Sequence, residues 1–167
     1  MLSLTRKTDY ALVALARLAQ EQQAAQGGQR LSARTIAEEF ELPQQLLMSL
    51  LKELHRAGIV DSTRGSQGGY VLAKAANRIS VAEVVEAIEG SARLTPCCAD
   101  EEPDGLCTMC SITERCPITG AIRELNGQIA DYLRTVTLEM LMHSTKGRKL
   151  PAVGKTARAK LAVLNTK

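Results

Sequence analysis

A glycine-rich turn flanked by two short apolar runs predicts a β-hairpin near the middle of this chain. The runs lie at positions 59–60 and 70–72, and three of the six residues at positions 64–69 are glycine. Short apolar runs bounded by turn residues are typical of strands, and glycine reaches the backbone conformations that close a tight turn. The hairpin directly follows a series of predicted helices, and this order of elements limits the chain to few architectures.

Three helices are predicted before the hairpin. An amphipathic pattern spans residues 4–23, and Ser32 is a suitable N-cap for a second, short helix. Pro43 suits the first turn of a third helix, which Gly58 ends. The apolar stripe of this third helix has a strong helical period and consists of Leu46, Leu47, Leu50, Leu51 and Leu54.

A further helix follows the hairpin, because Ser80 and Glu83 form a capping box and Gly90 supplies a stop. With one Phe, three Tyr and no Trp, the core must be built from aliphatic side chains, which favours packed helices. The predicted fold class is therefore mainly α, with a winged helix-turn-helix domain and a two-stranded wing. Its predicted bounds are 1–90 for the domain, about 33–56 for the helix-turn-helix and about 59–73 for the wing.

Winged helix-turn-helix domains bind DNA through the second helix of the motif and through the hairpin. Glutamine can pair with adenine, and an arginine at the wing tip can reach a phosphate or the minor groove. The predicted DNA-binding residues are Gln44, Gln45, Ser49, Lys52, Arg64, Gly65 and Ser66. His55 is expected to contact the backbone or a phosphate. The alternative is a protein-interaction module, a role that winged helices also fill.

Charge is distributed unevenly along the chain. Residues 144–167 hold seven Lys or Arg and no acid, whereas residues 1–143 hold 14 basic and 18 acidic residues. Affinity for DNA must therefore come from a local basic patch on each half of a dimer. The basic tail, residues 144–167, is predicted to be disordered. No run of 18 apolar residues occurs, so we expect a cytoplasmic protein that does not span a membrane.

All five cysteines lie within a window of 20 residues, at Cys97, Cys98, Cys107, Cys110 and Cys116. Clustered thiols in a non-secreted protein are more often metal ligands or redox groups than disulfides. The spacing favours a metal centre in residues 91–117 and does not separate structural zinc from an iron–sulfur cluster. A thiol oxidoreductase ranks last because no βαβ context surrounds the Cys-x2-Cys pair. No other catalytic constellation occurs, so we predict no enzyme.

Residues 118–143 are predicted to form a dimerisation helix and a short terminal helix. Apolar residues recur in steps of four and three, which is a heptad rhythm. They are Ile118, Ile122, Leu125, Ile129, Tyr132 and Val136. Such a seam packs along a partner helix, so the chain is predicted to be a homodimer.

Several short motifs occur in a distinctive order. They are Leu4-Thr5-x3-Asp9-Tyr10-Ala11, Ile36-Ala37, Arg64-Gly65-x2-Gly68-Gly69-Tyr70-x-Leu72 and Val81-x-Glu83-Val84, followed by the cysteine loop and a long helix ending Val136-Thr137-Leu138. Over about residues 1–142 this order resembles the Rrf family of bacterial winged-helix transcription regulators.

The resemblance implies an iron–sulfur cluster, [2Fe–2S] or [4Fe–4S], held by three loop cysteines. The last two of these are usually separated by five residues, as Cys110 and Cys116 are. The first ligand usually lies shortly after the capped helix, where Cys97 is our choice and Cys98 is the alternative.

The implied fourth ligand varies between family members. Thr119 stands where some members carry a histidine, so the candidates are Asp9, donated by the second subunit, and Cys107. The implied function is a repressor whose operator binding is controlled by the cluster, acting on iron–sulfur assembly or iron and redox genes. The alternatives are a nitric-oxide-sensing repressor of the same family and a zinc-stabilised interaction module.

Overall fold

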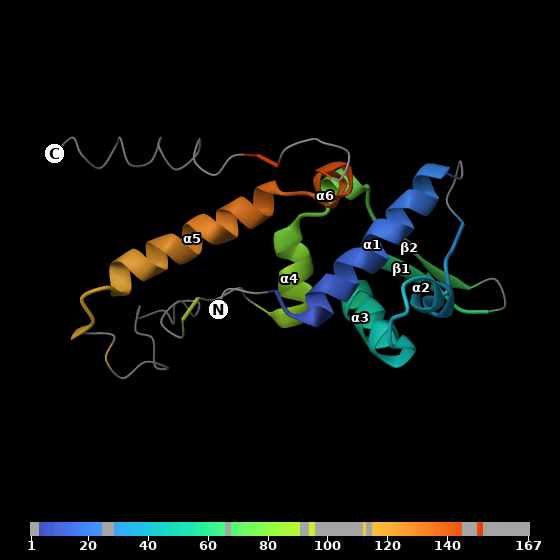
Figure 1. The fold of residues 1–167 in the computed structure, drawn as a ribbon, viewed down its shortest axis with the longest axis horizontal. Coiled ribbons are helices and arrows are strands. Elements are labelled where there is room, and N and C mark those ends of the chain that lie inside the picture. Colours follow the sequence, from blue (N-terminus) through green and yellow to red (C-terminus); the bar gives the residue numbers. More distant parts are fainter. Residues whose placement is uncertain are drawn as a thin grey trace.

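The computed structural model describes residues 4–24, 29–65, 68–90, 94–95, 112, 115–144 and 150–151. The elements are α1 (Arg6–Ala24), α2 (Ala33–Glu39), α3 (Gln44–Arg56), β1 (Val60–Thr63), β2 (Gly69–Leu72), η1 (Ala76–Arg78), α4 (Val81–Glu89), α5 (Thr119–Thr135) and α6 (Leu138–Ser144) (Figure 1). The predicted fold class, a mainly helical chain with a winged helix-turn-helix, is confirmed. Among these residues, no helix combines the length and hydropathy that crossing a membrane requires.

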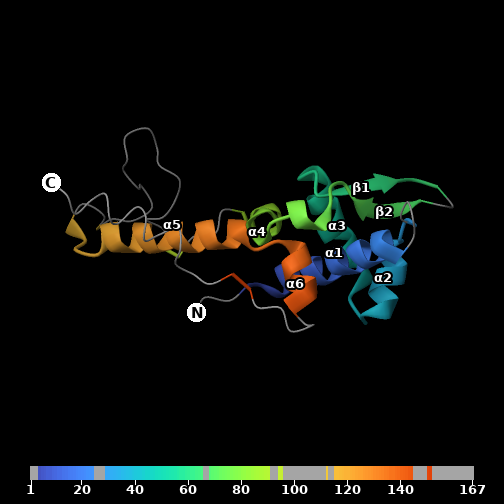
Figure 2. The same ribbon diagram turned by 90° about the horizontal axis from the view of Figure 1, so that it is seen from above.

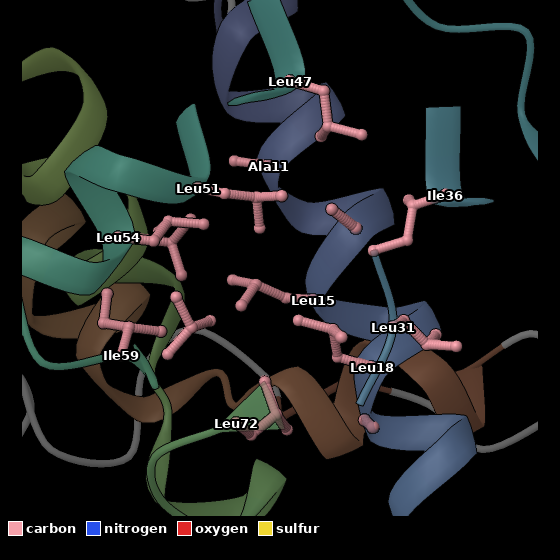
Figure 3. Packing of buried hydrophobic residues seen from close by; sticks show 14 of the residues in the cluster. Ala11, Leu15, Leu18, Leu31, Ile36, Leu47, Leu51, Leu54, Ile59 and Leu72 are labelled. Atoms are coloured by element: carbon pink, nitrogen blue, oxygen red, sulfur yellow. The ribbon is translucent and has the colours of Figure 1, made fainter. Parts of the chain in front are cut away.

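The main hydrophobic core lies between α1, α3 and the hairpin (Figure 3). Four of the five leucines in the predicted stripe of α3 are buried, and Leu46 is half-buried. Leu47, Leu51 and Leu54 share one cluster with Leu15 and Leu18 of α1, and Ile59 joins it from the side of the hairpin. Burial of each such side chain stabilises the fold by roughly 1.5–3 kcal/mol. The aliphatic core thereby fixes α3 against α1 and leaves the opposite face of α3 exposed.

The predicted helix caps form as hydrogen bonds. The Ser32 hydroxyl accepts from the Thr35 N–H over 3.0 Å at the start of α2. At the start of α4, Ser80 and Glu83 form the reciprocal capping box. Pro43 precedes α3 as its N-cap, one position earlier than the first helical turn that the sequence predicted. The Ser32 and Ser80 caps satisfy backbone donors that a helix start otherwise leaves unpaired, whereas Pro43 forms no side-chain cap hydrogen bond.

The wing consists of β1 and β2, paired antiparallel from Val60 opposite Leu72 to Thr63 opposite Gly69. A third piece of backbone extends it, because Leu31 and Tyr70 exchange two hydrogen bonds of 3.1 and 2.8 Å. The wing is therefore attached both to α3, through the chain, and to the segment that enters α2.

Helix α5 extends away from the winged domain, as both views show (Figures 1 and 2). Its base is fixed by backbone pairing between the segment before α4 and the segment after α5. The Val81 N–H donates to the Val136 carbonyl, and the Leu138 N–H donates to the Ile79 carbonyl, each over 2.8 Å. We call these two hydrogen bonds the junction. From the junction α6 returns to pack on η1 and α1.

Gly69 offers a direct test of the wing attachment. A Cβ at this position would lie 2.7 Å from the Leu31 carbonyl oxygen, which is backbone and cannot move without breaking the Leu31–Tyr70 pairing. We expect Gly69→Ala to lower the free energy of unfolding by about 1–3 kcal/mol, as overpacking does, measured by urea denaturation. The matched control is Gly127→Ala on α5, where nothing lies within 4 Å of the new Cβ. Gly127→Ala should leave the free energy of unfolding unchanged or raise it. Equal destabilisation by Gly69→Ala and Gly127→Ala would contradict the close packing of Gly69 against the Leu31 backbone.

Candidate nucleic-acid interface and candidate metal centre

An open groove of about 580 Å³ runs between α3, the wing and the start of α2. Four of its lining residues carry a positive charge and none carries a carboxylate. The lining residues are Ser32, Ala33, Arg34, Gln44, Met48, Lys52, His55, Arg56, Ser62, Thr63, Arg64, Gly69 and Tyr70. A cationic groove of this kind, beside an exposed helix face, suits a polyanionic duplex.

The structure brings three of the predicted DNA-binding residues together in this groove, namely Gln44, Lys52 and Arg64. Gln45 and Ser49 are exposed on α3 outside the lining, and Gly65 is exposed near the wing tip. The seventh residue, Ser66, lies outside the described residues. Each assignment to DNA contact stays a prediction.

Sequence reasoning passed over Arg34, Met48, Arg56 and Tyr70 as members of this groove. Spacing could have found one of them, because Met48 lies four residues after Gln44 and positions four apart share a helix face. The other three enter from α2, the end of α3 and β2, and only the tertiary fold brings those elements together.

His55 ties the end of α3 to the wing. Its Nδ1 lies 2.9 Å from the Val60 carbonyl oxygen, so Nδ1 carries the proton and Nε2 is left for other partners. The expectation that His55 contacts the backbone is confirmed. This contact sets the angle between α3 and β1.

The cations of the groove differ in their pairing. Arg34 forms an exposed ion pair with Glu38 at 2.7 Å. Within the described part of the chain, Lys52, Arg56 and Arg64 form no ion pair. These three side chains can therefore contact phosphates without first breaking an ion pair, and a groove in a net-acidic region retains a local positive field.

A carboxylate joins the first turn of α1 to the last turn of α4. Glu89 Oε1 accepts from the Thr5 N–H at 3.0 Å, from the Thr5 hydroxyl at 2.9 Å and from the hydroxyl of Thr8, which is fully buried. Partial burial raises the pKa of the Glu89 carboxyl, but the hydrogen bonds from Thr8 and Thr5 outweigh it and hold that pKa below its ordinary value. We call this group the Glu89 clamp. Its negative charge also suits the N-terminus of α1.

Of the predicted metal ligands, the structure describes Cys116 and Asp9. Cys116 is half-buried and free, just before α5. Hydrogen bonds from the Thr119 side chain and from the backbone at Ile118 and Thr119 lower the pKa of its thiol. A thiol with a lowered pKa is more readily present as the thiolate that binds metals. Cys97, Cys98, Cys107 and Cys110 lie outside the described residues.

Asp9 is exposed in the first turn of α1. The starts of α1 and α5 are well separated in both views (Figures 1 and 2). This separation agrees with the resemblance, which implies that Asp9 as a ligand comes from a second chain.

The segment that leads into the cysteines is attached to α5. The Leu94 N–H donates to Asn126 Oδ1 over 2.9 Å. Asn126 lies about two helical turns beyond Thr119, where α5 begins. This contact brings the chain just before Cys97 against the same helix that Cys116 precedes.

The heptad residues of α5 are exposed or half-buried in the single chain. No residue of α5 is buried in the single chain, and Ile118 and Leu125 are 58% and 45% exposed. Val136 differs, because it is buried within its own chain against Val81 and Val85. Tyr132 is half-buried and packs against the same cluster. The open part of the predicted dimer seam therefore runs from Ile118 to Ile129, with Ile122 and Ile129 half-buried.

A sequence model of the Rrf2 family, described as an iron-dependent transcriptional regulator, matches residues 4–144. The chain belongs to the Rrf2 family. One relative is the HTH-type transcriptional regulator IscR of Pectobacterium carotovorum, which is 33% identical over 141 residues, covering 84% of this chain and 79% of the relative. This Rrf2 chain is accordingly a DNA-binding transcription regulator with a winged helix.

Two solved structures are similar to this Rrf2 chain. IscR of T. potens superimposes with a TM-score of 0.61 at 26% identity, covering 90% of this chain and 94% of that one. CymR of B. subtilis, named as its global cysteine regulator, gives a TM-score of 0.63 at 26% identity, covering 86% and 98%. The fold is therefore shared by proteins with differently named roles.

The Glu89 clamp predicts a pH-dependent loss of stability. Glu89→Ala leaves the buried Thr8 hydroxyl without its acceptor, so we expect unfolding free energy at pH 7 to fall by about 1–3 kcal/mol. Because the folded-state pKa of Glu89 is lowered, its contribution is complete above its ordinary pKa and is lost as pH falls through the folded value. The difference in the free energy of unfolding between wild type and Glu89→Ala should therefore become smaller in acid. Glu86→Gln is the control and should change stability little at any pH, because among the described residues Glu86 forms an ion pair with Arg134 alone, at 4.0 Å.

Proposed function

We propose that this chain is a homodimeric repressor whose operator binding is controlled by an iron–sulfur cluster, and that it regulates iron–sulfur assembly or iron and redox genes. One observation carries the proposal. Helix α5 begins beside a free, half-buried thiol at Cys116 and ends in the junction, which is bonded to the winged domain. A single helix therefore connects the candidate metal centre with the winged domain that carries the candidate DNA-binding groove.

The donor set fits an iron–sulfur cluster. The proposed ligands are Cys97, Cys110 and Cys116, with Asp9 of the second subunit or Cys107 as the fourth and Cys98 as the alternative to Cys97. Cys116 supports this assignment through its lowered thiol pKa and its incomplete burial, which leaves it accessible. When bound, the cluster would supply a group that responds to iron supply, oxidants or nitric oxide. As the proposal concerns a regulator, it assigns no catalytic reaction to the chain, and such a regulator works in the cytoplasm with its DNA.

The chain's own contacts supply the coupling. The junction bonds the end of α5 to residues just before α4, and the Glu89 clamp bonds the end of α4 to α1. A change in how α5 is held is thus passed to the winged domain as a movement of the whole unit. In a dimer the two α3 helices must meet successive major grooves about 34 Å apart, so a small rotation changes operator affinity.

The dimer is proposed to form along α5. Its open seam from Ile118 to Ile129 has the heptad spacing that two helices use to pack together. We expect Leu125→Glu to shift the chain toward monomer in analytical ultracentrifugation and to weaken operator binding. Gly127→Glu introduces the same charge at an exposed position outside the seam and should leave the dimer intact. Dissociation of both variants, or of neither, would contradict an interface on this face.

The cluster is tested by purification without oxygen. We expect a brown protein with iron and labile sulfide, and an operator affinity that differs about 5- to 150-fold between cluster-bound and cluster-free forms. Gel-shift titration at one fixed salt concentration measures that difference, because DNA affinity is salt-dependent. Equal affinity and equal sequence preference of the two forms would contradict cluster control.

Single substitutions identify the ligands. Cys116→Ser and Cys110→Ser should abolish cluster loading, and comparing Cys97→Ser with Cys98→Ser selects the first ligand. The fourth ligand is whichever of Asp9→Ala and Cys107→Ser shortens cluster lifetime under a chelator. These readouts are absorbance and iron content, and circular dichroism of the apoprotein checks folding.

Three other functions remain distinguishable in the same preparation. A colourless protein with one zinc per chain and no DNA selectivity would favour the zinc-stabilised interaction module. Loss of DNA binding specifically on exposure to nitric oxide would favour the nitric-oxide-sensing repressor. The likeness to CymR, which is named a global cysteine regulator, favours a third candidate, a regulator of cysteine-related genes, which operator binding by a metal-free protein would support.

A further inference from the structure

One large apolar side chain stands on the groove-facing side of α3. Met48 is 38% exposed and lies one helical turn from both Gln44 and Lys52, and all three residues line the groove. Single exposed apolar residues are ordinary on protein surfaces. Met48 is informative because its neighbours along the exposed line of α3 are polar or cationic, and because this line is the part of a winged helix that enters a major groove.

The walls around Met48 are fixed before any ligand binds. His55 bonds to the Val60 carbonyl and thereby ties the end of α3 to β1. Leu31 bonds to Tyr70 and thereby ties β2 to the entrance of α2. The fold therefore sets the position of Met48 relative to the wing. Which base Met48 faces then depends on how the groove docks on the DNA duplex.

The chemistry of the side chain narrows what it can recognise. A thioether donates no hydrogen bond and accepts only weakly, so its favourable contacts are with apolar or polarisable groups. The major-groove edges of the four bases present hydrogen-bond donors and acceptors and one apolar group, the C5-methyl of thymine. 5-Methylcytosine carries the same methyl on the same ring carbon.

We propose that Met48 reads a pyrimidine C5-methyl group in the major groove of each operator half-site. The inference rests on the proposed operator binding and adds a specificity determinant to it. Gln44, one turn earlier, is placed to pair with an adenine, and Lys52, one turn later, is placed to reach a phosphate. The half-site that fits α3 therefore contains a methylated pyrimidine opposite Met48.

The test uses the full chain, in cluster-bound and cluster-free forms, and duplexes that it enriches from a random synthetic pool. Each thymine of the enriched site is replaced singly by deoxyuridine, which removes only the methyl. At one position per half-site we expect wild-type affinity to fall about fourfold, the effect of burying one methyl group. Met48→Leu should keep this effect, whereas Met48→Ala and Met48→Gln should bind thymine and uracil sites equally.

Met140→Ala is the matched control, because Met140 on α6 is 39% exposed and lies outside the groove lining. It should bind as wild type and retain the uracil effect. A second pool, in which 5-methylcytosine replaces cytosine, distinguishes the two sources of the methyl. Enrichment of methylated sites by wild type but not by Met48→Ala supports the inference with 5-methylcytosine as the source.

Two outcomes would overturn the inference, and they differ in what else they overturn. If duplexes are enriched but wild type and Met48→Ala show the same methyl dependence, or none in either pool, the reading by Met48 is wrong while the proposed function stands. If neither form of the protein enriches any sequence, operator binding itself is refuted and this inference fails with it.

Discussion

Two backbone hydrogen bonds attach the long helix α5 to the winged domain. They bond Val81 to Val136 and Leu138 to Ile79, and they pass between segments more than 50 residues apart. Val136 is buried beside them against Val81 and Val85, so water does not compete for these bonds. Because the long helix leaves from this point, its direction relative to the recognition helix is set here.

The Glu89 clamp completes the path from the junction to α1. Helix α4 is bonded at its start to the end of α5 and at its finish to Thr5 and Thr8. Hydrogen bonds at the two ends of this nine-residue helix thus connect α5 with α1. In the sequence, the cysteine segment (residues 91–117) connects the end of α4 to the start of α5. Any constraint on that segment therefore acts on both of these helices.

Spacing between nearby residues was sufficient to predict the helices and their caps. The features that were not predicted depend on contacts between residues far apart in the sequence. The leucine stripe of α3 and the Ser80–Glu83 capping box depend on residues three or four positions apart, so spacing was sufficient to find them. Val136 continued the heptad in the sequence, yet it faces its own chain because the helix ends at Thr135 and the backbone turns extended into the junction. Thr5 and Glu89 are 84 residues apart, and no periodic pattern connects them. Arg34 and Arg56 joined the groove for a similar reason, because the wing brings their helices to one surface.

The ion pairs show how a region with a net negative charge can carry a cationic groove. Arg17 lies 2.8 Å from both Glu21 and Glu39, and Glu38 is held by Arg34. Several acidic side chains of residues 1–143 are therefore paired with arginine around α1 and α2, while Lys52, Arg56 and Arg64 form no ion pair within the described residues. Unpaired cations gathered along one face favour docking of DNA through that face. With so few phosphate contacts available per chain, tight binding requires both halves of a dimer, and the spacing of the two grooves becomes the quantity on which regulation can act.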